Sequence, residues 1–335
     1  MRTTWIAVTI GIGLFCGACA SNEIYAPPGP VSAAATVKPE LGVNTHLDSG
    51  PRLDKAVDLG ARWIRMDANW SQLEALPGQW DYRSLDAVLA RAQALHLKVY
   101  ACLISPPAWA SSNGHGNGVP DPAAWRAFVR AVARHSRGRI AAYGIWNEPN
   151  LEENWVGTPA QYVEVLLKPA FQEIRAADPK ALVAGPDLAH LYSARIDPLA
   201  FFLEFKRVGG DAWVDVISHH LYGGDDLQAK VQGFYLGPIR YRPGLLQMLQ
   251  QAGLGGKDLW ITEWGVNSQD RSEELQCVWL AEQWAFLSSL RQVRKIFVYH
   301  LADDGGDPER WGLLRADGSP KPGFLVLKNL LKNGV

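Results

Sequence analysis

The chain has 335 residues, and 47% of them are hydrophobic, which is enough for one large buried core. Its 33 lysine and arginine residues nearly balance its 34 aspartate and glutamate residues, so the formal net charge is -1. A chain without a basic field cannot neutralise many phosphates, and this excludes nucleic acid as a partner held in that way.

The first twenty residues have the pattern of an export signal. Arg2 supplies the positive end, residues 5–15 are apolar, and Ala18-Cys19-Ala20 offers small residues for cleavage. The stretch is too short to cross a bilayer as a single helix. Residues 16–19 also resemble a bacterial lipobox, in which Cys19 would be lipidated and would tether the protein to a membrane. Both interpretations predict export, to the periplasm, to the outer membrane as a lipoprotein, or to the medium.

Residues 21–40 are rich in Pro and Ala, lack apolar periodicity, and are expected to form a tether. From residue 41 to 335, short apolar runs alternate with amphipathic segments, as in βαβ units around a parallel sheet. The predicted strands cover residues 41–46, 62–67, 97–103, 140–147, 181–186, 214–219, 259–263 and 295–300. The predicted helices cover residues 52–59, 82–96, 121–136, 158–176, 196–207, 242–252, 272–291 and 320–333.

Eight strands, each followed by a helix, predict a single (β/α)8 TIM barrel rather than a doubly wound sheet. Cys102 falls in the third strand and Cys277 on the seventh helix. These positions lie on different sides of a barrel, so we expect two unpaired thiols.

The barrel also predicts where a site would lie, because side chains at the carboxyl ends of the strands line its mouth. Glu148 closes the fourth strand and Glu263 the seventh, on nearly opposite sides. Glycoside hydrolysis requires one protonated carboxyl group beside the departing oxygen and one ionised carboxylate that attacks or activates water. The two glutamates can supply both. The alternative is that a glutamate only caps a helix or pairs with Arg65.

Two motifs, Asn147-Glu148-Pro149 and residues 261–265 (Ile-Thr-Glu-Trp-Gly), resemble the retaining glycoside hydrolases of clan A. Residues 42–46 are most similar to family 39 and its relatives that cut bacterial exopolysaccharides. The resemblance implies that Glu148 is the acid/base and Glu263 the nucleophile. It further implies that Asn147 binds the sugar 2-hydroxyl, that Arg65 holds the nucleophile ionised, and that His220 and Tyr222 lie beside it.

Physical chemistry agrees with these roles. Arg65 is always protonated and would keep an adjacent Glu263 charged, whereas apolar surroundings such as Trp146 and Trp155 would favour the protonated form of Glu148. A retaining mechanism predicts carboxyl groups roughly 5–5.5 Å apart.

Aromatic residues after strand ends are placed to stack on sugar faces, with simple packing as the alternative for each. Trp264, next to the predicted nucleophile, is the strongest candidate. Many clan A enzymes carry a Trp at the end of strand eight, where this chain has Tyr299-His300 and reaches Trp311 only later. The further predicted substrate-binding or stacking residues are His46, Trp70, Trp109, Trp155 and Tyr299.

No metal or other cofactor is expected. His219 and His220 are adjacent on a strand, so their rings point to opposite faces, and no His-Glu-x-x-His motif occurs. Residues 303–307 (Asp-Asp-Gly-Gly-Asp) are rich in oxygen but lack the EF-hand spacing, so we interpret them as a solvated turn.

The sequence therefore predicts an exported, monomeric glycosidase that acts on a polysaccharide or oligosaccharide, either a bacterial exopolysaccharide or a plant-type glycan. Long loops after strands three, six and eight favour internal cutting, and acidic residues at the mouth disfavour uronic-acid substrates. Two alternatives stay open. One is a non-catalytic glycan-binding or assembly lipoprotein on the same barrel, and the other is a transglycosylase that uses the same residues.

Overall fold

The computed structural model describes residues 38–46, 50, 52–191, 194–224, 226–236, 241–269, 271–304 and 310–334. The predicted export signal with Cys19, residues 21–37 of the predicted tether and residues 305–307 of the predicted turn lie outside these ranges. Within them, no helix is both long enough and apolar enough to span a membrane.

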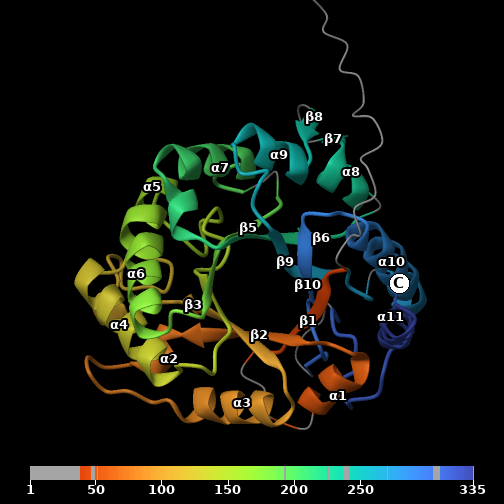
Figure 1. Ribbon diagram of the computed structural model, residues 1–335, viewed down its shortest axis with the longest axis horizontal. Coiled ribbons are helices and arrows are strands. Elements are labelled where there is room, and N and C mark those ends of the chain that lie inside the picture. The colour runs from red at the N-terminus through yellow and green to blue at the C-terminus, as the bar shows by residue number, and fades with distance from the viewer. Residues whose placement is uncertain are drawn as a thin grey trace, which may run out of the picture. The chain divides into compact units, whose positions relative to one another are not determined.

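The fold is a closed barrel of eight parallel strands, in which neighbours in sequence are also neighbours in the sheet (Figure 1). This confirms the predicted (β/α)8 barrel. Glu40, assigned above to the tether, instead begins the first strand. The barrel strands are β1 (Glu40–Asn44), β2 (Trp63–Asn69), β3 (Lys98–Ile104), β4 (Ala142–Ile145), β5 (Leu182–Ala189), β6 (Val216–Tyr222), β9 (Leu259–Gly265) and β10 (Val293–Val298).

Helices surround the barrel (Figure 1), and several begin at clear sequence signals. Asp121 caps α4 by accepting hydrogen bonds from the backbone of Ala123 and Ala124, and Pro122 occupies the first turn. The helices are α1 (Arg52–Leu59), α2 (Trp70–Leu73), α3 (Arg83–Ala94), α4 (Pro122–His135), α5 (Pro159–Gln161), α6 (Lys168–Ala177), α7 (Pro198–Arg207), α8 (Leu227–Gln232), α9 (Leu245–Gln251), α10 (Ser272–Ser288) and α11 (Pro322–Lys332), with short helices η1 (Ala108–Ala110) and η3 (Gly210–Trp213).

Two features depart from the predicted elements. The single helix expected over residues 158–176 is divided by a π-helical stretch, η2 (Tyr162–Leu167), between α5 and α6. An antiparallel pair, β7 (Phe234–Leu236) with β8 (Tyr241–Pro243), lies in the connection between β6 and α9. Strands of three residues carry too little alternation to be recognised from sequence.

The interior of the barrel base is filled by aromatic rings. Every barrel strand except β1 contributes one residue to a small separate cluster, in which Trp63 and Trp260 have ring centroids 5.3 Å apart. Strand β1 contributes Gly42 at this level, and a Cβ atom there would collide with the ring of Phe297. The base is therefore a packed core that closes the barrel below the mouth.

Gly42→Ala should destabilise the barrel by roughly 1–3 kcal/mol, because Phe297 is completely buried and has no room to move aside. A suitable control is Gly256→Ala, where an added Cβ meets nothing within 4 Å. Chemical denaturation of both variants checks this, and equal midpoints would contradict the packing described here.

Candidate active site

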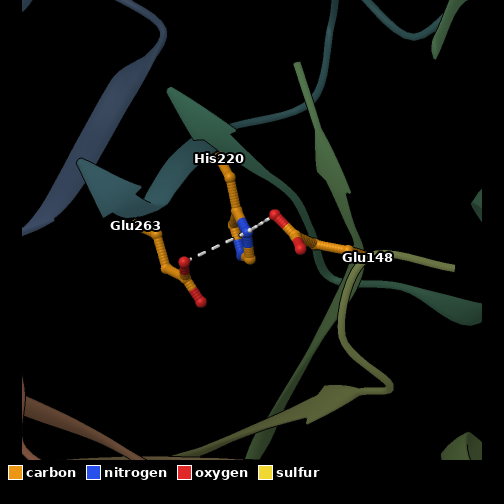
Figure 2. Close-up of side chains that lie close together, drawn as sticks. All are labelled: Glu148, His220 and Glu263. Atoms are coloured by element: carbon orange, nitrogen blue, oxygen red, sulfur yellow. Dashed lines mark hydrogen bonds and ion pairs between the residues drawn. The ribbon is translucent and has the colours of Figure 1, made fainter. Parts of the chain in front are cut away.

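The predicted strand-end residues converge on one side of the barrel. Glu263 is supplied by β9, His220 by β6, and Glu148 by the segment that follows β4. Figure 2 shows the imidazole of His220 between the two glutamates. One oxygen of each carboxylate and one ring nitrogen of His220 all lie within 4.8 Å of one another. The fold therefore brings together two carboxylates that are 115 positions apart in the chain, from 148 to 263.

Glu263 is held by two strong donors. Nη1 of Arg65 donates a hydrogen bond of 2.7 Å to Oε1, and the hydroxyl of Tyr222 donates to Oε2. Arg65 is itself almost completely buried and also donates to the side-chain oxygens of Asn44 and Asn147, both at 2.8 Å. Glu263 thus lies in a fixed orientation beside a permanent positive charge, as expected from the sequence.

Glu148 has a different environment. Its Oε1 lies 2.9 Å from Nδ1 of His220, and the amide of Asn154 donates to its Oε2 at 3.3 Å. The residue has a φ of 46°, in the left-handed region, and its backbone N–H donates to the carbonyl of Asp187 at 3.0 Å. No arginine or lysine bonds this carboxylate within the described residues, so Glu148 and Glu263 meet unequal electrostatic surroundings.

The charges of the two glutamates shift the pKa values of the side chains around them. Burial by itself would lower the pKa of His220, but the charge of Glu263 and the hydrogen bond to Glu148 outweigh it and raise that pKa. Burial and the charge of Glu263 raise the pKa of Tyr222 well above its ordinary value, so its hydroxyl stays a donor. The charge of Glu263 likewise raises the pKa of Arg65 in spite of burial.

A cavity of about 870 Å³ opens over the two glutamates. His46 lies on its wall, with Nδ1 3.3 Å from Oδ2 of Asp67, and this hydrogen bond raises the pKa of the imidazole. The lining residues are His46, Arg65, Asp67, Ile104, Asn147, Glu148, Asn154, Leu191, Tyr222, Glu263, Tyr299, His300, Asp304 and Trp311. The predicted residues His46, Arg65, Asn147, Tyr222 and Tyr299 are therefore all on the cavity.

Three predicted stacking residues, Trp70, Trp155 and Trp264, are buried away from the cavity, and this part of the prediction is wrong. Trp264 is fully buried and stacks on Trp279, with ring centroids 5.4 Å apart. Trp70 is also fully buried, and its ring stacks on Phe128. The side chain of Trp264 points into the layer between β9 and α10, because alternation along a strand places it on the opposite side from Glu263. Trp70 is instead the first residue of α2.

Trp155, Trp109 and Trp311 have three different positions. Trp155 is fully buried, whereas Trp109 is 39% exposed but packs against Trp70 outside the cavity. Trp311 lies on the cavity wall, and its ring meets Tyr222 edge to face with centroids 5.0 Å apart. Among the described residues that line this cavity, Trp311 is the one tryptophan, and it belongs to the connection between β10 and α11.

A second cavity of about 440 Å³ adjoins the first and shares Ile104, Asn147 and Asn154 with it. Its wall comes from the connections after β3 and β4, and its side chains are mainly neutral and polar. The lining residues are Ile104, Ser105, Asn113, His115, Gly116, Asn117, Trp146, Asn147, Glu153 and Asn154. The sequence patterns gave no sign of it, since the loops that form it have no periodicity.

The spacing of Glu148, His220 and Glu263 would also fit a small cation. The guanidinium of Arg65, however, is already hydrogen-bonded to Glu263 and would repel a metal ion placed beside it. The two thiols, Cys102 and Cys277, are unpaired as expected. The rings of His219 and His220 face opposite ways, as predicted. The ring of His219 is hydrogen-bonded to that of His190, whereas the ring of His220 bonds Glu148.

Comparison with known proteins agrees with this geometry. Residues 42–298 match the family described as cellulase (glycosyl hydrolase family 5), whereas no curated protein matches the sequence. A family 39 glycoside hydrolase from the gut symbiont Bacteroides cellulosilyticus WH2 has a similar structure, with a TM-score of 0.72 and 22% identity over 88% of this chain. This chain covers 64% of that protein, which is less than two thirds of its length.

Two further solved structures share the fold. A family 39 β-xylosidase from Caulobacter crescentus has a TM-score of 0.66 and 20% identity, over 90% of this chain and 73% of the other. A GH5_18 protein from Streptomyces cattleya, in complex with GlcNAc, has a TM-score of 0.69 and 15% identity, over 89% and 81%. At such identities the likeness establishes the fold. The family match extends over most of the barrel, and on that basis the chain belongs to glycosyl hydrolase family 5, within the clan A retaining glycosidases that its motifs resemble.

Proposed function

We propose that the chain is a retaining O-glycosyl hydrolase in which Glu148 is the acid/base and Glu263 the nucleophile. The observation that carries the proposal is that one oxygen of each carboxylate lies within 4.8 Å of the other. Retaining glycosidases have carboxyl groups roughly 5–5.5 Å apart, whereas inverting enzymes keep roughly 6.5–9.5 Å to admit water. The short separation favours direct attack on the sugar.

In the first step, Glu263 attacks the anomeric carbon while protonated Glu148 gives its proton to the departing glycosidic oxygen. The bond from carbon to that oxygen breaks, and a glycosyl ester forms on Glu263. In the second step, ionised Glu148 takes a proton from water, whose oxygen displaces Glu263. Both glutamates return to their starting states, and the anomeric configuration is retained.

The neighbouring side chains support this division of roles. Arg65 and Tyr222 both donate to Glu263, which stabilises its charge before attack and orients its oxygens. Asn147 presents its amide group to the same cavity while its oxygen accepts from Arg65, so it is fixed beside the nucleophile. By the clan resemblance, that amide binds the sugar 2-hydroxyl.

Glu263→Ala should reduce turnover by several orders of magnitude, because no other carboxylate can form the covalent intermediate. Glu148→Ala should keep activity on aryl glycosides with good leaving groups, and azide should restore it by entering the space left by the carboxylate. Release of aryl alcohol and reducing ends, with product configuration followed by NMR, measures both effects. Full activity of both variants on polysaccharide would refute the assignment, and longer products instead of free sugars would indicate transglycosylation.

We further propose that the substrate is a neutral oligo- or polysaccharide chain that occupies both cavities and is cut internally. Arg65 is the one lysine or arginine among the described residues that line either cavity, and it is engaged by Glu263. The wall of the second cavity is rich in asparagine, whose amide groups can hydrogen-bond the neutral hydroxyl groups of a sugar. Both cavities meet at Asn154, which lets one chain extend through them.

His115→Ala should lower the ratio of kcat/KM for a hexasaccharide to kcat/KM for an aryl monoglycoside by roughly 2–12-fold, the loss expected for one hydrogen bond. Its side chain is exposed on the second cavity. Cellohexaose and xylohexaose, each with its p-nitrophenyl monoglycoside, are practical probes. His96→Asn, at an exposed position outside both cavities, is the control, and an unchanged ratio in both variants would argue for an exo-acting enzyme.

We also propose export, which is supported by the pattern of residues 1–20. If Cys19 carries a lipid, the mature protein should fractionate with membranes and Cys19→Ala should release it or block its maturation. Fractionation combined with mass spectrometry of the mature N-terminus checks this. A soluble protein that begins after residue 20 would instead favour ordinary signal cleavage.

A further inference from the structure

A buried carboxylate below the glutamate pair has no role in the mechanism described so far. Asp187 is completely buried and belongs to β5, where the pairing with β6 slips by one residue. Pro186 is opposite Ser218 and Leu188 is opposite His219, so Asp187 is the extra residue of a β-bulge. Its φ of 49° lies in the left-handed region. Bulges near active sites commonly redirect a side chain, and here the bulge directs Asp187 toward the catalytic residues.

Both oxygens of the Asp187 carboxylate accept a hydrogen bond. The hydroxyl of Tyr100 donates to Oδ2 at 2.5 Å, and the hydroxyl of Thr262 donates to Oδ1. Gly144 makes room for this contact, because a Cβ there would collide with the hydroxyl of Tyr100. Two hydroxyl donors on an otherwise inaccessible group are the arrangement expected for an ionised carboxylate, which can only accept.

Two basic side chains face Asp187 from the site. Nε2 of His220 lies 3.8 Å from Oδ1, and Nη2 of Arg65 lies 4.0 Å from Oδ2. Nε2 of His220 is buried and makes no hydrogen bond within the described part of the chain. On the other side of the ring, Nδ1 lies 2.9 Å from Glu148 and 3.5 Å from Glu263. The imidazole thus stands among three carboxylates.

We propose that Asp187 is a positioning residue that keeps His220 protonated. The summed charge of the groups around His220 then stays zero through both steps of the reaction. The inference rests on the proposed function. Before reaction, with Glu148 protonated, the charges of Glu263 and Asp187 balance those of Arg65 and His220. In the glycosyl-enzyme, Glu263 is an uncharged ester and Glu148 is ionised, and the balance is the same.

The remaining titratable groups near His220 do not disturb this balance. Asp67 of β2 is ion-paired with His46. Burial lowers the pKa of His219 well below its ordinary value, so that ring stays neutral. Burial raises the pKa values of Cys102, Tyr100 and Tyr222, which therefore keep their protons.

Asp187→Asn removes the charge with little change of shape. Two cations would then face one fixed carboxylate, so the Glu148–His220 pair should release its first proton at lower pH. The basic limb of the pH profile of kcat/KM on an oligosaccharide should move down by about one pH unit, within the range typical for loss of a nearby opposite charge. Tyr100→Phe, which keeps the charge and removes one hydrogen bond, should leave the limb in place.

Histidine nitrogen NMR tests the inference without any turnover. The His220 ring, assigned by comparison with a His220→Asn sample, should keep its proton to a higher pH in the wild type than in Asp187→Asn. A neutral ring in the wild type at pH 6 would overturn the inference even if Asp187→Asn failed to fold. Equal shifts in Asp187→Asn and Tyr100→Phe would also overturn it. Absence of glycosidase activity would refute the proposed function instead, and the NMR result would still decide this question.

Discussion

The site depends first on one buried cation. Arg65 leaves β2 inside the barrel and hydrogen-bonds Asn44 of β1, Asn147 after β4, and Glu263 of β9. Burial of a guanidinium that is 3% exposed is costly unless it meets acceptors of suitable charge, and here Nη1 and Nη2 have such acceptors. The hydrogen bonds of Arg65 therefore fix the relative positions of four strand ends, β1, β2, β4 and β9. One of the acceptors fixed in this way is the proposed nucleophile, Glu263.

Register shifts and unusual backbone angles in the sheet position the other residues of the site. Strand β9 slips against β6 between His219 and His220, which allows Thr262 and Glu263, adjacent in sequence, to bond Asp187 and Arg65 respectively. Trp146, Glu148 and Asp187 all have positive φ, a conformation that costs about 1–3 kcal/mol per residue. The aromatic packing of the barrel base and the hydrogen bonds around Arg65 are the interactions available to offset it.

The parts that could be predicted from sequence are those that follow from local pattern. Short apolar runs that end in Asn147-Glu148 and Thr262-Glu263 mark strand ends, and the barrel then determines that these ends meet. Asp187 and Trp311 could not be assigned in this way. Their directions depend on bulges and on loop paths, which are set by contacts between strands distant in sequence. The role proposed for Asp187 follows only from its position beside His220 and Arg65.

The proposed acid and the proposed nucleophile lie on different kinds of structural element. Glu263 and its donors belong to strands, whereas Glu148 is contacted by Asn154, whose loop also forms the wall of the second cavity and whose carbonyl accepts from the indole of Trp146. Loops change in length and sequence more readily than barrel strands. Related barrels could therefore diverge in the sugars they accept by exchanging the connections after β3 and β4, while the covalent chemistry at β9 is inherited unchanged.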